Sequence, residues 1–102
     1  MKLPYLAAIA CLLGAALPAQ AQTGPVAVRS LAASCTNCHG TNGKAVAGAG
    51  MESLAGEPQD KLLQKLKDFR SGAKPATIMH QISKGYSEEQ LTLIAEYFSA
   101  QK

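Results

Sequence analysis

Apolar side chains recur at helical spacing along four stretches of the chain. The first predicted helix runs from about Pro25 to Asn37, because proline suits the first turn of a helix and Gly40 ends it. The second predicted helix begins at Pro58, ends at Gly72 and is the most amphipathic of the four. Its apolar face carries Leu62, Leu63, Leu66 and Phe69.

Two further helices are predicted in the last third of the chain. The third is short: it contains Thr77, Ile78, Met79 and Ile82 and ends near Gly85. The fourth begins at Ser87, which forms a capping box with Gln90. Its apolar positions are Leu91, Ile94, Ala95 and Phe98. Because no stretch alternates apolar and polar residues with a period of two, we expect an all-α fold of about four short helices.

The segment from Gly40 to Gly56, between the first two helices, is rich in glycine and in small residues. Such a composition disfavours regular structure, and a loop of this length is uncommon in a small domain unless it has a function. We interpret the segment as a loop laid across a bound group. A disordered surface loop is the alternative for residues 41–49.

The first 21 residues are mostly apolar and end in Ala19-Gln20-Ala21, a pattern typical of signal-peptidase sites. We therefore predict a cleaved secretory signal peptide at residues 1–21 and a single domain at residues 22–102 in the periplasm. An uncleaved anchor would need about 20 apolar residues. The run from Leu3 to Leu17 is shorter, so we expect no membrane span in the mature chain.

The composition predicts that this domain needs a cofactor or a cross-link. The chain has 102 residues, a net charge of +3 and no tryptophan, and its aromatic residues beyond residue 21 are Phe69, Tyr86, Tyr97 and Phe98. So short a chain excludes a multidomain protein, and its own side chains make only a small core. The weakly basic charge gives no indication of nucleic-acid binding.

Two of the three cysteines, Cys35 and Cys38, lie outside the predicted signal peptide, which contains Cys11. In an exported protein they could form a disulfide. That bond would close a loop with only two intervening residues, so it would remove little entropy from the unfolded chain.

The run Cys35-Thr36-Asn37-Cys38-His39 contains C-x-x-C-H, the signature of c-type haem attachment. Two cysteines three residues apart on a helix share a face, where both thiols can react with the vinyl groups of one haem. His39 then follows as an axial ligand of the iron. A thioredoxin-type pair would need a preceding strand, and a structural zinc site would need four ligands where only His80 remains beyond this run.

A haem that carries electrons needs a second axial ligand, and methionine is a common one. The candidates are Met79, Met51 and His80. Met79 follows His39 by forty residues, which is enough chain to reach the opposite side of the haem, so we predict Met79 as the ligand. Met51 is predicted to pack against the haem or the core, and His80 points about 100° away from Met79 on a helix.

We expect the haem to replace part of the missing core. The residues predicted to pack around it, or to join the helices on it, are Leu62, Leu66, Phe69, Ile82, Ile94 and Phe98.

Together these features resemble class I cytochromes c over about residues 26–102. Besides the haem motif and Met79, the resemblance rests on Leu54-Ala55-Gly56, on the run from Leu66 to Gly72 and on the run from Tyr86 to Phe98. It implies one covalently attached haem c with low-spin His/Met ligation, and an all-α fold in which the first and last helices cross. Many members have a proline in the loop before Leu-Ala-Gly, where this chain has Met51-Glu52-Ser53.

Within that class, the run from Pro75 to Ser87 looks most like the cytochrome subunit of flavocytochrome c sulfide dehydrogenase. This resemblance implies docking on a flavoprotein subunit that oxidises sulfide and passes electrons through flavin to haem, with other redox proteins as acceptors. We therefore expect a non-catalytic carrier of single electrons. The alternatives are a free-standing soluble carrier and a haem enzyme or gas sensor with a labile sixth ligand.

Overall fold

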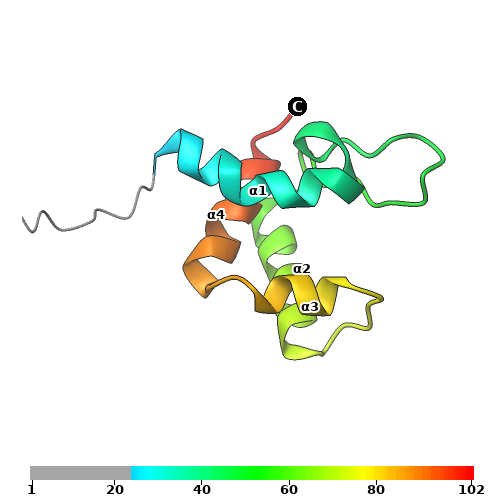
Figure 1. Ribbon diagram of the computed structural model, residues 1–102, viewed down its shortest axis with the longest axis vertical. Helices are drawn as coiled ribbons and strands as arrows, with labels where there is room; N and C mark the ends of the chain where they lie inside the picture. The colour runs from blue at the N-terminus through cyan, green and yellow to red at the C-terminus, as the bar shows by residue number, and fades with distance from the viewer. Residues whose placement is uncertain (1–23) are drawn as a thin grey trace, which may run out of the picture.

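The computed structural model describes residues 24–102, so the predicted signal peptide lies outside the described residues. Within that part of the chain the regular structure is entirely helical, which confirms the predicted all-α fold (Figure 1). The elements are α1 (Pro25–His39), the 3-10 turn η1 (Thr41–Gly43), α2 (Gln59–Ser71), α3 (Met79–Lys84) and α4 (Glu88–Ser99). None of the helices in residues 24–102 is long and apolar enough to cross a membrane.

Glycines end α1 and α2, as predicted. Helix α1 continues two residues beyond the predicted end, to His39, and Gly40 then leaves the helical conformation with φ +88°. Gly72 closes α2 in the left-handed conformation, with φ +84°. Pro58 precedes α2 as its N-cap instead of being its first helical residue.

The last two helices also begin at identifiable residues. Helix α4 has the predicted capping box: Gln90 N–H donates to the Ser87 hydroxyl, and Ser87 N–H donates to the Gln90 side-chain carbonyl. Helix α3 begins two residues later than predicted, at Met79. The Ile78 carbonyl accepts from the N–H groups of Gln81 and Ile82 and so closes its first turn.

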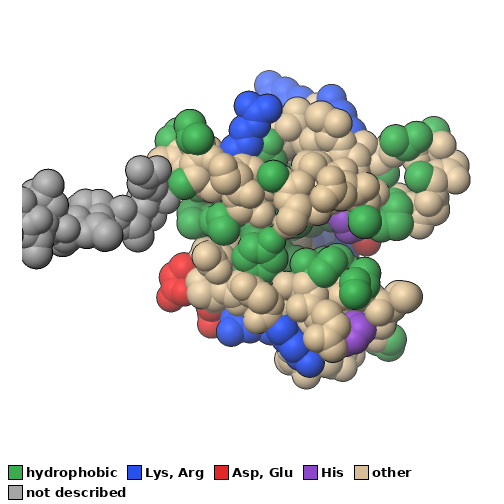
Figure 2. Space-filling model, in the orientation of Figure 1, with side chains coloured by type: hydrophobic (Ala, Val, Ile, Leu, Met, Phe, Trp, Pro, Cys, Tyr) green, Lys and Arg blue, Asp and Glu red, His purple; other side chains and the backbone are tan. Residues whose placement is uncertain are grey.

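The helices surround a hollow with only a small conventional core on one side of it. Helix α4 packs against α1 and α2, and α2 also packs against α3 (Figure 1). The buried apolar residues are Ala32, Leu62, Leu91, Ile94, Ala95 and Phe98. Figure 2 shows the hollow between α1 and the lower helices, with apolar side chains along its edges.

The glycine-rich loop is attached to α4 at both ends. Buried Gly43, with φ +79°, lies so close to Phe98 that a Cβ atom there would be 2.6 Å from Phe98 Cδ1. The Gly43 carbonyl accepts from the N–H groups of Leu54 and Ala55. Gly56 N–H donates to the Phe98 carbonyl. These contacts bring residues 51–55 back to the edge of the hollow.

Candidate cofactor site

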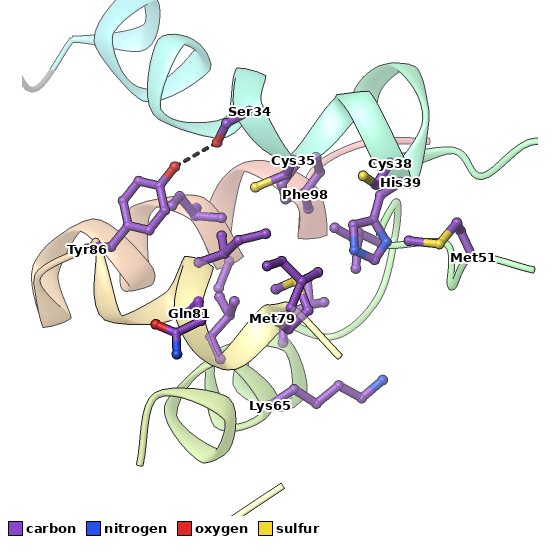
Figure 3. Close-up of a pocket in the computed structure, with 18 residues that line it drawn as sticks. Ser34, Cys35, Cys38, His39, Met51, Lys65, Met79, Gln81, Tyr86 and Phe98 are labelled. Carbon is purple, nitrogen blue, oxygen red and sulfur yellow. Dashed lines mark hydrogen bonds between the residues drawn. The ribbon is translucent and has the colours of Figure 1, made fainter. Parts of the chain in front are cut away.

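All four predicted site residues line one cavity. Its volume is about 550 Å³, and its walls are mainly apolar. Cys35, Cys38 and His39 come from the end of α1, and Met79 comes from the start of α3 (Figure 3). The fold therefore brings together residues that are forty positions apart in the sequence.

The two cysteines are free thiols on the wall formed by α1. Cys35 is half-buried and Cys38 is exposed. Burial raises the pKa of the Cys35 thiol, and a hydrogen bond with Ser34 opposes the shift. The Cys35 thiol is therefore protonated near neutral pH, so this wall presents an uncharged group to the cavity.

His39 is held in one tautomer by a backbone carbonyl. Its ring is buried, with 9 % of the residue exposed, and its Nδ1 lies 2.6 Å from the Glu52 carbonyl oxygen. Because a carbonyl can only accept, Nδ1 carries the proton and donates it to Glu52. The other ring nitrogen, Nε2, then has a free lone pair for a metal. Met51-Glu52-Ser53 stands out in the sequence as a departure from the pattern that the chain resembles, but the Glu52 carbonyl could not be identified from it, because a backbone group leaves no signature in the side chains.

The three candidates for the second ligand differ in their position. Met79 is half-buried and lines the cavity from α3, across from Cys35 in Figure 3. Met51 also lines the cavity, but it directly precedes Glu52, which is hydrogen-bonded to His39. Met51 therefore belongs to the same wall as His39. His80 is not among the residues that line the cavity.

Most of the apolar residues predicted to surround the haem line the cavity. Leu62, Leu66, Ile82, Ile94 and Phe98 all line the cavity. Phe69 does not, and the Lys74 ammonium lies 5.5 Å from the centroid of its ring instead. Phe69 shares the apolar face of α2 in the sequence pattern, but Leu62 and Leu66 occupy the wall of the cavity, so for Phe69 the alternative role of joining the helices stays a prediction.

One long-range hydrogen bond joins opposite walls of the cavity. The Ser34 hydroxyl on α1 lies 2.6 Å from the Tyr86 hydroxyl, between α3 and α4 (Figure 3). Both residues line the cavity. The pair was not predicted, because 52 residues separate two side chains with no shared motif.

Comparisons with known proteins point to one family. A family model described as cytochrome c matches residues 27–102. Over 68 residues the chain is 38% identical to the "Cytochrome subunit of sulfide dehydrogenase" of Chlorobaculum tepidum, a match covering 67% of this chain and 60% of that protein.

Two further relatives extend the comparison. The chain is 39% identical over 71 residues to a "Thiosulfate dehydrogenase electron acceptor" of Thiomonas intermedia, covering 70% of this chain and 33% of the relative. It is 32% identical over 69 residues to "Cytochrome c-553" of Nitratidesulfovibrio vulgaris, covering 65% of this chain and 68% of the relative. The chain thus spans about three fifths of the sulfide dehydrogenase subunit and a third of the thiosulfate dehydrogenase acceptor.

Proposed function

Because the chain belongs to the cytochrome c family, whose members carry covalently attached haem c, we propose that Cys35 and Cys38 attach one haem and that His39 and Met79 bind its iron. When bound, the haem supplies a metal centre that accepts and releases one electron. The observation that carries the proposal is the convergence of these four side chains on a single apolar cavity.

The residues of the cavity fit such a group chemically. Two thiols stand on one wall, and next to them is a histidine whose Nε2 is free to bind a metal. A thioether, a soft ligand that favours reduced iron, projects from the opposite wall. The apolar lining excludes water, which also disfavours the more highly charged oxidised state.

Binding of the haem iron by both His39 and Met79 would favour electron transfer without bond-making catalysis. With both side chains bound, the iron would have no open position for a substrate. A haem enzyme or gas sensor would require the Met79 side to open readily. Slow binding of carbon monoxide to the reduced protein is the expected result, and rapid binding would favour the enzyme or sensor.

The assignment of Met79 is tested by Met79→Ala in the haem-loaded protein. We expect loss of the methionine-to-iron charge-transfer absorbance and a lower reduction potential, because the thioether that favours reduced iron is removed. Met51→Ala is the matched control, since Met51 lines the same cavity from the His39 wall, and it should keep both properties. An unchanged spectrum and potential in Met79→Ala would show that the assignment is wrong.

We further propose that the carrier works in the periplasm, as residues 22–102 after removal of a signal peptide, and accepts electrons from a sulfide-oxidising flavoprotein. The name of the Chlorobaculum tepidum relative supports this partner. The test is rapid mixing of the oxidised cytochrome with a candidate flavoprotein and sulfide. Haem reduction faster than with sulfide alone supports the partner, and N-terminal sequencing of the exported protein checks the cleavage site.

A free-standing carrier is the second candidate. It is favoured by the similarity to a "Thiosulfate dehydrogenase electron acceptor" and to "Cytochrome c-553". Recovery of the exported protein as a monomer, with no flavoprotein bound and no reduction by one, would favour this candidate over the subunit.

A further inference from the structure

The carbonyl that holds His39 belongs to a loop with little regular structure. We call residues 44–57 the support loop; it lies between η1 and α2. Near its middle, the Ser53 hydroxyl donates to the Gly43 carbonyl at 3.0 Å, and Leu54 N–H donates to the same oxygen at 2.7 Å. These bonds fix residues 53 and 54, which directly follow the Glu52 carbonyl, and so give the support loop its first attachment.

The side chain of Glu52 provides a second attachment. Its carboxylate forms an ion pair with the Lys65 ammonium on α2. Both side chains are partly exposed, 53 % for Glu52 and 31 % for Lys65. Among residues 24–102 there is one other ion pair, between Lys67 and Glu88, and it does not involve the support loop. Glu52 thus touches His39 through its backbone and α2 through its side chain.

We propose that Lys65 is a positioning residue for His39: its ion pair with Glu52 fixes the backbone carbonyl that accepts the Nδ1 proton. The inference rests on the proposed ligation of iron by His39. A conformationally rigid residue at position 52 could hold this carbonyl in place through its own backbone. At Glu52 the backbone carbonyl accepts from His39, and the side chain is free to anchor the loop through the ion pair.

The physical consequence concerns the strength of His39 as a ligand. A firmly held hydrogen bond from Nδ1 makes the imidazole a stronger electron donor through Nε2. A stronger donor stabilises the oxidised form of a bound iron more than the reduced form. Breaking the ion pair loosens the carbonyl, so the reduction potential rises and the Nδ1 proton exchanges faster with solvent.

The test uses the charge-neutral double variant Glu52→Gln/Lys65→Met in the haem-loaded protein. Because one positive and one negative charge are removed together, the net charge of the protein stays unchanged. The matched control is Glu88→Gln/Lys67→Met, which removes the other ion pair. We expect a raised potential and about two- to fivefold faster exchange of the His39 Nδ1 proton in the first variant only, as a partly exposed ion pair warrants.

Single variants identify the pair as the cause. Glu52→Met and Lys65→Met should each speed the exchange as much as the double variant, because either change breaks the same interaction. Lys65→Arg keeps the pair and should leave the exchange rate unchanged. An effect of Lys65→Met without one of Glu52→Met, or equal behaviour of the two double variants, would overturn the inference.

The failure of this inference differs from a failure of the proposed function. If the unmodified protein lacks the spectrum of a histidine-ligated low-spin haem, the proposed ligation itself is wrong. If that spectrum is present and the Glu52 and Lys65 variants behave like the control, only the positioning role of Lys65 is overturned.

Discussion

The haem-free chain should not hold its native structure. The described fold has six buried apolar residues, and the cavity occupies the space between its helices. Those six contain only four large side chains, those of Leu62, Leu91, Ile94 and Phe98. A chain made without haem therefore has to keep the cavity open or collapse into it.

The volume of the cavity decides between these two outcomes. At about 24 cal/mol per Å³ of empty cavity, holding about 550 Å³ open would cost about 13 kcal/mol. Water that enters the cavity from its open side lowers this free-energy cost, but the water must then hydrate the apolar walls, which is itself unfavourable. Domains of this size are stable by about 5–15 kcal/mol in total. The upper limit of the cost is therefore as large as the whole stability, and we expect the haem-free chain to be unfolded or a molten globule.

The assay compares residues 22–102 produced with and without haem. The haem-free protein should melt without a cooperative transition, bind the dye ANS and lose the near-ultraviolet dichroism of its tyrosines. The haem-loaded protein is the control and should melt in one sharp transition. A cooperative melt of the haem-free chain with native near-ultraviolet dichroism would refute the reasoning.

Two further predictions concern contacts beside the cavity. Gly43→Ala should destabilise the haem-loaded protein by about 1–3 kcal/mol more than Gly48→Ala in denaturant melts, because both glycines have φ +79° but only at Gly43 would the new Cβ meet Phe98; equal losses would contradict the packing argument. Ser34→Ala and Tyr86→Phe should each cost about 1 kcal/mol, and the double variant no more than either single variant. Additive losses would show that the two hydroxyls act independently.

The helices could be predicted because their limits depend on local residue chemistry. A glycine that accepts a positive φ ends α2, and a serine–glutamine capping box begins α4. Errors of two residues occurred at the end of α1 and the start of α3. The carbonyl of Ile78 starts α3, and a backbone group of this kind has no residue preference to reveal it.

The candidate site, too, could be predicted only in part. The haem motif and Met79 could be identified as candidates because the proposed chemistry uses their side chains. The contacts that hold these residues in place could not be predicted from the sequence. The carbonyl of Glu52 is available to any residue type, and the Ser34–Tyr86 bond depends on how α1 comes to lie over the turn before α4. Such contacts follow from tertiary packing, which periodicity does not specify.

The two walls of the cavity are also held with unequal strength. The His39 wall belongs to the 15-residue helix α1, which packs on α4 through buried residues, and its ring is fixed by Glu52. Met79 opens a helix of six residues that packs mainly on α2. The Ser34–Tyr86 hydrogen bond is therefore an important tie between the two walls. Since a ligand is only as firmly placed as the element that carries it, the proposed bond between Met79 and iron should break before the proposed bond from His39 when the protein is heated or denatured.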